Sequence, residues 1–434
     1  MERQSWCVYR IRKGAVAMKI RIIRILSLIL FLIVLSACSM SNPKTSIVDV
    51  TPKTAKLTLM VYMAADNDLE TYALKNLKAM EKAEYEGINV LVLVDRHEGY
   101  DETDGNWNDT RFFEIAHDTG SGSNIFSKRL DCAPLGLSAT IQTELDTADW
   151  MVLKTFIEFS KEAYPAEKYA LIMWGHGAGL GSFAIDERSD RAMSINELEK
   201  AVIGQGLCVI GFDTCFGGVI ESLYELKECT TYITGCPGMT PSQGWDYKKL
   251  LEGIEKGSCS SFEIAQTMSQ TSSVPAFVYT TSAINALFES FENFAGELSL
   301  SVTDNESRQF LFETLCSSKA YSAQTYPCDM FLEVRALALN YTSFVKPELK
   351  QSANNLVQAV DGAVMSPDGN VPEISIYFIP KESAYIVSSR HPSEYIKNLS
   401  QSGQCSFVKN SQRWVPTISG NSGSLLDKLF YTVF

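Results

Sequence analysis

From residue 57 onward, hydrophobic positions form short continuous runs that are separated by longer amphipathic or polar segments. Four runs predict buried strands, at residues 57–63 (LTLMVYM), 88–94 (INVLVLV), 169–174 (YALIMW) and 207–212 (LCVIGF). The segments that follow these runs predict helices, at residues 69–85, 149–163, 195–203 and 218–226. Continuous apolar strands that alternate with helices are typical of an α/β fold, with a mostly parallel sheet covered by helices on both faces.

The rest of the chain carries fewer strand patterns. Residues 111–115 predict an edge strand, residues 276–281 and 374–379 predict later strands, and residues 286–360 are largely helical in pattern. No clear linker separates residue 57 from residue 420. We therefore predict a core over residues 57–285, and a C-terminal helical region with a late strand over residues 286–434, packed on that core.

The N-terminus has a different pattern, in which one apolar run follows a basic start. Residues 25–37 are apolar apart from two serines. The run is shorter than the roughly 20 residues of a transmembrane helix and has the length of a signal-peptide core. The sequence LSAC at 35–38 then resembles a bacterial lipobox, which implies cleavage before Cys38 and lipid attachment to its thiol. The alternative is a simple membrane helix with an incidental cysteine.

The segments before and after this signal fit the same interpretation. Met18 begins such a signal naturally, so residues 1–17 are explained by a mis-assigned start further upstream. Residues 39–56 are rich in Ser, Thr, Pro and Lys and predict a tether. We expect a mature protein outside the cytoplasm, held to a bacterial membrane by lipid at Cys38.

Composition removes several classes of protein. The 434 residues are 45% hydrophobic and provide a large core, while the net charge of -13 argues against nucleic acid as a partner. The eleven cysteines contain no CxxC pair, which argues against a zinc ribbon or a thioredoxin-like motif, and they are too dispersed for a compact disulfide framework. The glycines at 175–181 do not fit GxGxxG, and no Walker A sequence is present.

Two candidate catalytic residues follow consecutive predicted strands. His176 follows the strand at 169–174, and Cys215 follows the strand at 207–212. The intervening loop, helix and strand form a βαβ crossover, which sets such strands side by side with both carboxyl ends at one edge. An imidazole and a thiol in one cleft suit nucleophilic catalysis. The alternative is that both residues are buried fillers at strand ends.

The sequence around each residue favours Cys215 over Cys208. Cys208 falls inside an apolar strand, where a thiol is usually a small inert core group. Cys215 precedes glycines and a predicted helix, whose dipole can stabilise a thiolate. Glycines also flank His176, so backbone N–H groups there can approach a substrate carbonyl closely and donate to an oxyanion.

At these residues the chain resembles the clostripain-like cysteine peptidases, which are relatives of caspases and gingipains. The matching stretches are residues 57–70, 169–179, 186–201, 209–221, 241–247 and 374–380. The resemblance implies a caspase-like α/β fold and an endopeptidase that cuts proteins or peptides. It implies Cys215 as the nucleophile, His176 as its partner, and the backbone N–H groups of Gly177 and Cys215 as oxyanion donors. It also implies self-cleavage in the loop after the histidine, which contains Arg188 and Arg191.

The resemblance bears on substrate choice as well. Family members favour Arg or Lys before the cut bond, because acidic side chains line the primary pocket. Asp213 matches one of these acids, although it could instead cap the following helix. Gln243 stands where the family commonly has a second acid, and a single carboxylate selects a buried cation less strongly. Basic specificity and self-cleavage at Arg188 or Arg191 are therefore left open.

We assign no metal ligand and no firm cofactor, and calcium is the one candidate. The acidic residues of 66–68 and of 186–190 could contribute to a calcium site, but the first group is more simply explained as helix caps and the second as solvated surface. Our hypothesis is a lipid-anchored, extracytoplasmic cysteine endopeptidase. The alternative is a non-catalytic surface binding lipoprotein built on a peptidase scaffold.

Overall fold

The computed structural model describes residues 54–179, 182–307, 331–343, 346–377 and 405–411, with Leu311 and Arg413 as single positions. The predicted signal peptide, the lipobox with Cys38 and nearly all of the tether lie outside the described residues. Within the described ranges, no helix combines the length and the apolar character needed to cross a membrane.

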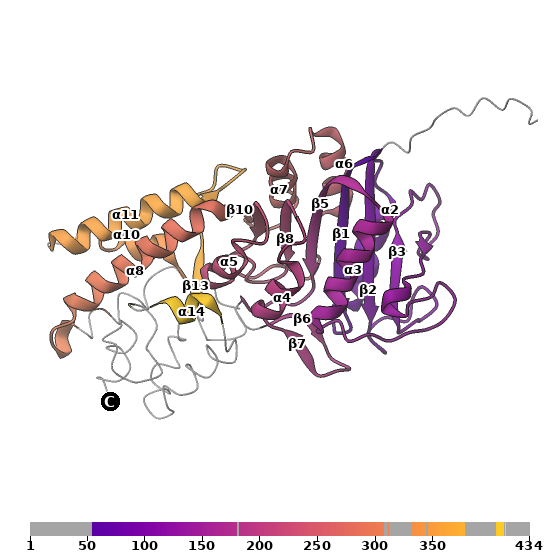
Figure 1. Cartoon of the computed structure of the whole chain (residues 1–434), viewed down its shortest axis with the longest axis horizontal. Helices are drawn as coiled ribbons and strands as arrows, with labels where there is room; N and C mark the ends of the chain where they lie inside the picture. The colour runs from indigo at the N-terminus through magenta and orange to yellow at the C-terminus, as the bar shows by residue number, and fades with distance from the viewer. Residues whose placement is uncertain are drawn as a thin grey trace, which may run out of the picture. The chain divides into compact units, whose positions relative to one another are not determined.

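A nine-stranded sheet organises the described part of the chain (Figure 1). Its spatial order is β12-β10-β9-β8-β5-β1-β2-β3-β4. The strands are β1 (Ala55–Ala65), β2 (Ile88–Arg96), β3 (Thr110–Glu114), β4 (Lys128–Arg129), β5 (Ala166–Trp174), β8 (Val209–Asp213), β9 (Tyr232–Gly235), β10 (Phe277–Thr280) and β12 (Val364–Met365).

The central strands of this sheet are parallel. From β9 through β8, β5 and β1 to β2, each neighbouring pair is parallel, whereas β3 and β4 on one side and β10 and β12 on the other are antiparallel. The predicted parallel sheet is therefore confirmed for its centre, within a mixed sheet. Residues 111–115 were expected at an edge, but β3 pairs with β4 on its outer side.

Helices cover both faces of the sheet, as predicted. One face packs with α3 (Trp150–Ala163), α4 (Ile195–Val202) and α5 (Ile220–Leu226), and the other with α2 (Glu70–Glu81), α6 (Tyr247–Lys256) and α7 (Ser261–Gln270). Successive side chains of a strand point to opposite faces. Accordingly, β1 contributes Met60 and Tyr62 to one core and Leu59 and Val61 to the other.

Local capping explains where two of these helices begin. Ser194 and Glu197 form a capping box at the start of α4. The expected capping of α2 by residues 66–68 is wrong, because its N-cap is Leu69 and no side chain caps it. Asn67 instead accepts a hydrogen bond from the Leu69 N–H and donates to the carbonyls of Ala64 and Ile185. Asn67 thus stabilises its own turn and also contacts strand β6 (Phe183–Asp186).

The later part of the chain is largely helical and also completes the sheet. It contains η3 (Thr281–Ala283), α8 (Ile284–Ser301), β11 (Phe331–Glu333), α10 (Val334–Leu339), α11 (Pro347–Ala363), β13 (Ser375–Tyr377) and α14 (Ser406–Asn410). Helices α8 and α11 lie side by side (Figure 1). Strand β12 extends the main sheet beyond β10, and β11 pairs with β13. The strand at 331–333 was not anticipated, and the boundary at residue 285 stays a prediction.

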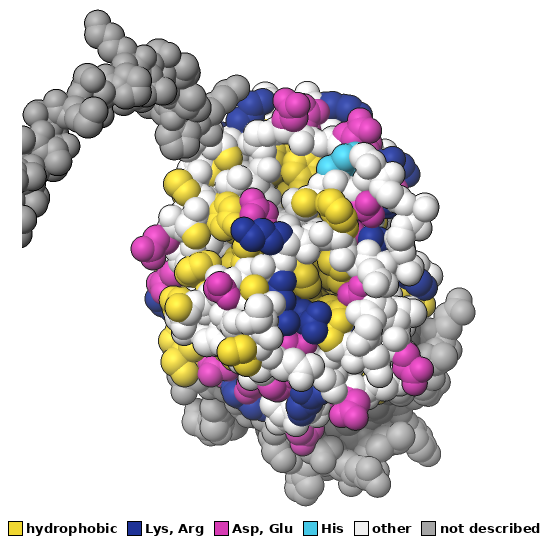
Figure 2. All heavy atoms as spheres, turned by 90° about the vertical axis from the view of Figure 1, so that its right-hand side faces the viewer, with side chains coloured by type: hydrophobic (Ala, Val, Ile, Leu, Met, Phe, Trp, Pro, Cys, Tyr) yellow, Lys and Arg dark blue, Asp and Glu magenta, His cyan; other side chains and the backbone are white. Residues whose placement is uncertain are grey.

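Two small elements complete the description. Strands β6 (Phe183–Asp186) and β7 (Arg191–Met193) form a hairpin after β5, and η1 (Ala133–Leu135) is a short 3-10 helix. On the face shown in Figure 2, Lys and Arg side chains are interspersed with Asp and Glu side chains.

Candidate active site

His176 and Cys215 lie at the same edge of the sheet. Strands β5 and β8 are parallel neighbours, and their last residues, Trp174 and Asp213, are partners in the register. Each candidate residue follows two positions later. Gly177 packs directly against the loop after β8, since a Cβ atom on it would lie 2.5 Å from the Cys215 carbonyl oxygen. The sequence therefore brings the two loops into contact, and only glycine fits at position 177.

The other cysteine is at the opposite end of the same strand. β8 begins at Val209, so Cys208 precedes the strand instead of lying inside it. Five strand residues at about 3.3 Å each place Cys208 roughly 17 Å from the edge that carries Cys215. Burial raises the pKa of the Cys208 thiol, which is typical of an inert structural cysteine.

The imidazole is held by a carboxylate that the sequence did not single out as its partner. The Nε2 atom of His176 lies 2.6 Å from Oδ1 of Asp68, in the turn after β1. Both side chains are partly exposed, at 38% and 61%. Asp68 lies at this edge because β1 is parallel to β5, so both strands end there. With Nε2 occupied by Asp68, Nδ1 is the ring nitrogen left for a second partner.

The thiol of Cys215 has a partner of its own. The Thr240 N–H donates to Sγ at 3.3 Å, and Sγ lies 3.6 Å from the Thr240 carbonyl oxygen. Burial raises the pKa of this thiol above its usual range. In this conformation, therefore, the thiol is held protonated against the loop after β9, and the imidazole is held by Asp68.

Asp213 is buried beneath the loop at 244–247. Only 4% of the residue is exposed. Its Oδ2 accepts hydrogen bonds from the Trp245 N–H and the Tyr247 hydroxyl, both at 3.0 Å. Among the described residues, its Oδ1 has no partner. Burial raises the pKa of this carboxyl to about 7. The capping role considered for Asp213 is wrong, because the N-cap of α5 is Val219.

Gln243 immediately precedes the loop at 244–247. Its side chain is exposed, and its carbonyl oxygen accepts a hydrogen bond from Asn76 at 3.1 Å. The next residue, Gly244, has φ of 67°, and a Cβ there would lie 2.5 Å from Oδ2 of Asp213. This glycine allows the loop to close over the buried carboxylate.

A family model for the clostripain family matches residues 61–410, which include β5, β8 and both candidate residues. The chain belongs to the clostripain family. Clostripain from Hathewaya histolytica is 27% identical over 237 residues, which cover 47% of this chain and 43% of clostripain. The chain thus spans less than half of the length of that relative.

Solved structures show that this clostripain-family chain has the expected fold. An inactive zymogen of a C11 protease from Parabacteroides distasonis matches with a TM-score of 0.59 at 18% identity, over 83% of this chain and 99% of that one. A secreted C11 cysteine protease from Bacteroides thetaiotaomicron, in complex with an irreversible peptide inhibitor, matches with a TM-score of 0.54 at 16% identity. The second match covers 80% of this chain and 99% of the other.

The two arginines considered for self-cleavage in this clostripain-family chain lie on the β6–β7 hairpin. The Arg188 guanidinium lies 2.5 Å from the carboxylate of Glu144, and that of Arg191 bonds Asp146. Both arginine side chains remain over one-third exposed, at 35% and 44%. The hairpin tip includes Asp190 with φ of 52°, which marks a tight turn. Both sites are thus exposed, and each arginine has an acidic partner.

The C-terminal region supports the loop that carries Cys215. The Ser375 N–H in β13 donates to the Gly218 carbonyl at 3.0 Å, and its hydroxyl donates to the Pro237 carbonyl at 2.7 Å. Phe216 stacks on Phe331 in β11 with ring centroids 4.2 Å apart. Strands far away in the sequence therefore position the residues on either side of the thiol.

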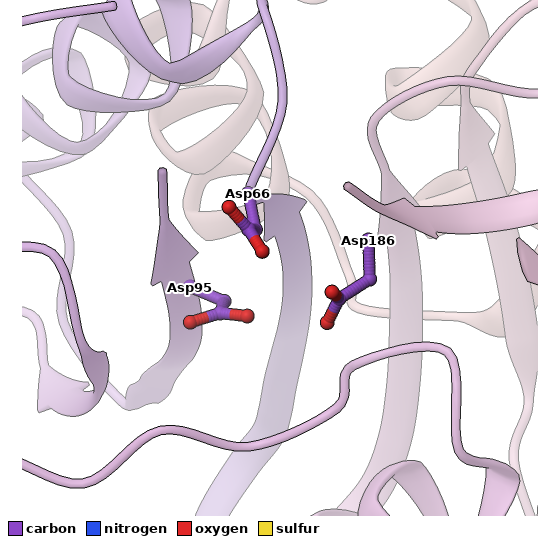
Figure 3. Close-up of side chains that lie close together, drawn as sticks. All are labelled: Asp66, Asp95 and Asp186. Atoms are coloured by element: carbon purple, nitrogen blue, oxygen red, sulfur yellow. The ribbon is translucent and has the colours of Figure 1, made fainter. Parts of the chain in front are cut away.

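The sequence patterns do not indicate Thr240 and Asp95, which both lie close to this edge of the sheet. Thr240 contacts the thiol from the loop after β9, and the parallel pairing of β9 with β8 was the signal that could have placed it there. Asp95 follows the apolar run at 88–94, but β2 continues to Arg96 and buries this carboxylate completely, beside those of Asp66 and Asp186 (Figure 3).

Proposed function

We propose that this chain is a cysteine endopeptidase that hydrolyses peptide bonds, with Cys215 as the nucleophile and His176 as its proton-transfer partner. The observation that carries the proposal is that thiol and imidazole follow adjacent parallel strands, in loops that touch through Gly177. Membership of the clostripain family supports the same chemistry. The peptide inhibitor bound to the B. thetaiotaomicron relative supports a peptide or protein substrate.

In the proposed reaction, Sγ of Cys215 attacks the scissile carbonyl carbon after His176 has accepted the thiol proton. The imidazolium then gives this proton to the leaving amine, and water hydrolyses the thioester. The backbone N–H groups of Gly177 and Cys215 stabilise the oxyanion. Asp68 on Nε2 leaves Nδ1 to face the thiol and orients the ring. Since Thr240 now holds Sγ, a rotation of the Cys215 side chain must precede attack.

We further propose a preference for a basic residue before the cut bond. The unpartnered Oδ1 of the buried Asp213 supports this, because a buried carboxylate without a cation is stabilised when a substrate guanidinium or ammonium approaches it. Gln243 contributes a neutral, exposed side chain at the rim. A single acid predicts a weaker preference than two acids would give.

Self-processing of the β6–β7 hairpin is the next part of the proposal. Arg188 and Arg191 are exposed basic residues on a hairpin that follows the histidine loop. Their ion pairs are with partly exposed carboxylates, so little energy opposes their release.

The location outside the cytoplasm is proposed from residues 18–38 alone. Their basic start, apolar run and final Cys38 favour a lipid anchor in a bacterial membrane. The proposed partners are therefore a peptide or protein substrate and a bacterial membrane, and nucleic acid is not among them.

The test is hydrolysis of a mixed library of fluorogenic peptides by three proteins: the parent chain, Cys215→Ala and Cys208→Ala. We expect Cys215→Ala to abolish hydrolysis and Cys208→Ala to leave the rate nearly intact, because Cys208 lies at the far end of β8. Hydrolysis that survives unchanged in Cys215→Ala would refute the assignment.

A non-catalytic binding lipoprotein is the second candidate function. The observation that favours it is the Cys215 thiol itself, which is held protonated by burial and bonded to Thr240. A peptide reagent carrying a thiol-directed electrophile distinguishes the two functions at neutral pH. Selective labelling of Cys215 supports the peptidase, and equal labelling of the cysteines supports the binding protein.

A further inference from the structure

Two cysteine thiols contact one short loop beside the candidate nucleophile. The loop is residues 236–240 (CPGMT), which come directly after β9. Its Thr240 N–H donates to Sγ of Cys215 at 3.3 Å. Sγ of Cys236, which belongs to the loop itself, lies 3.8 Å from the Met239 carbonyl oxygen. The candidate nucleophile and a second thiol are therefore bound to the same stretch of backbone.

These contacts limit the distance between the two sulfur atoms. The Met239 carbonyl oxygen and the Thr240 nitrogen belong to one peptide group, in which they are about 2 Å apart. The sulfurs of Cys215 and Cys236 are therefore no more than about 9 Å apart. A disulfide needs a sulfur–sulfur distance of about 2 Å, so new side-chain rotamers and a small shift of the loop at 236–240 must bring the two sulfurs together.

Backbone hydrogen bonds hold the two cysteine-bearing segments side by side. The Phe216 N–H donates to the Gly238 carbonyl at 2.7 Å, and the Gly218 N–H donates to the Cys236 carbonyl at 2.9 Å. Both donors lie within three residues of Cys215. Only a small rearrangement therefore separates the two thiols, because the backbones that carry them are already in contact.

The two thiols differ in their access to an oxidant. Cys215 is partly exposed, whereas only 7% of Cys236 is exposed. Burial raises the pKa of the Cys236 thiol to about 11, against the hydrogen bond from the Gly238 N–H, and the charge of Cys215 raises it as well. An oxidant therefore reacts with Cys215 first. Because the product is an uncharged sulfenic acid, that charge is lost, and Cys236 ionises more readily.

We propose that Cys215 and Cys236 form a reversible oxidation site, in which a hydroperoxide converts the two thiols into a disulfide and inactivates the enzyme. Cys236 is the resolving thiol of this pair. The proposal rests on the proposed function, in which Cys215 is the nucleophile.

The reaction has two steps, with hydrogen peroxide as the simplest oxidant. The Cys215 thiolate attacks one peroxide oxygen, so that an S–O bond forms, the O–O bond breaks and the sulfur gives up two electrons. The departing hydroxide takes up the proton that the Cys215 thiol had lost. The Cys236 thiolate then attacks the oxidised sulfur, so that an S–S bond forms and the S–O bond breaks, and the second hydroxide takes up the proton of Cys236. Two thiols and one hydrogen peroxide give one disulfide and two water molecules.

The disulfide has two consequences for the site. Hydrolysis stops, because a sulfur in a disulfide is no longer a thiolate nucleophile. The sulfur is also protected, because a free sulfenic acid that meets more peroxide becomes a sulfinic acid, which thiols do not reduce. A dithiol reductant regenerates both cysteines from the disulfide.

The first experiment maps the disulfide in the full chain. The protein is treated with hydrogen peroxide, its remaining thiols are alkylated, and it is digested with chymotrypsin without reductant. Cleavage after aromatic residues releases Cys215 within residues 213–216 and Cys236 within residues 233–245, so neither peptide contains another cysteine. We expect mass spectrometry to find these two peptides joined. Oxidised Cys215 together with an alkylated Cys236 would overturn the proposal.

The second experiment follows peptide hydrolysis through oxidation and reduction. Each protein is compared with its own untreated rate, so differences in basal rate cancel. The parent should lose hydrolysis with peroxide and regain most of it with dithiothreitol. Cys236→Ser can still accept from the Gly238 N–H but cannot form the disulfide, so the fraction that it regains should be several-fold smaller. The control Cys208→Ala removes a partly buried thiol at the other end of β8 and should recover as the parent does. Equal recovery of Cys236→Ser and the parent would overturn the proposal.

The two experiments separate failure of this proposal from failure of the proposed function. Hydrolysis that peroxide abolishes without any joined peptides would refute the disulfide and leave Cys215 as the nucleophile. Hydrolysis that continues in fully disulfide-bonded protein would refute both the inactivation and the catalytic role of Cys215. Peptide mapping uses the parent chain alone, so it decides whether the disulfide forms even where Cys236→Ser does not fold.

Discussion

The strongest test of the substrate pocket is Asp213→Asn. The substitution keeps the size of the side chain and an oxygen that can accept from the Trp245 N–H, but it removes the charge. A substrate guanidinium about 4 Å from Oδ1 gains about 4 kcal/mol at an effective dielectric constant near 20. Because the pKa of Asp213 is about 7, ionising it at pH 7 costs only about 0.4 kcal/mol. Losing this net attraction in Asp213→Asn corresponds to a fall of roughly 10²- to 10³-fold in kcat/KM for a basic substrate.

The assay compares two fluorogenic peptides that differ only in having Arg or Leu before the cut bond. We expect Asp213→Asn to lower kcat/KM for the Arg peptide by that factor and to leave the Leu peptide within a few-fold. In the parent, kcat/KM for the Arg peptide should also fall about tenfold for each pH unit below 7, since the carboxyl then holds its proton.

Two outcomes would contradict this reasoning. An Arg peptide that Asp213→Asn cleaves within about fivefold of the parent rate would show that the buried carboxylate does not select the substrate. An equal loss for both peptides, with a lower melting temperature, would show that the carboxylate only holds the loop at 244–247.

Three further variants test the geometry and the buried charges. Gly177→Ala should lower kcat/KM and the melting temperature, because the new Cβ would lie 2.5 Å from the Cys215 carbonyl oxygen. The control Gly122→Ala places its Cβ where nothing lies within 4 Å, so it should match the parent. Equal effects of the two substitutions would refute the close contact. Asp68→Asn should lower kcat by roughly two- to fivefold with KM unchanged, as expected for a partly exposed pair, and a change in KM alone would contradict its orienting role. Burial raises the pKa of Glu221 to about 8 from an ordinary 4.5, so the free energy of unfolding falls as pH rises between these values. Glu221→Gln should therefore raise the free energy of unfolding at pH 7 by about 3 kcal/mol, measured by urea unfolding. An unchanged dependence of stability on pH in this variant would refute the reasoning.

Much of the central sheet could be predicted from the chain itself. Residues 57–63 and 169–174 are continuous apolar runs, and a strand buried on both faces needs such a run. The observed strands, β1 and β5, contain these runs and extend them by a few residues. The crossover rule then placed His176 and Cys215 at one edge.

Local patterns were less informative where tertiary contacts decide the structure. Asp95 reads as the end of a strand because its side chain is charged, yet pairing with β3 keeps it inside the sheet, where Thr110 meets one of its oxygens. Strand β11 lies in a segment of helical composition and forms because β13 pairs with it. Such contacts between distant residues leave no periodic signal in either segment.

The hydrogen bonds from Ser375 to the Gly218 carbonyl join residues that are 157 positions apart, so they form late during synthesis. A polypeptide emerging from its amino end completes the segment around Cys215 long before the residue that steadies it exists. The loop around the thiol therefore gains this support only after residue 375 has been made. Any truncation before residue 375 would remove the hydrogen bonds by which Ser375 holds Gly218 and Pro237 beside the Cys215 loop.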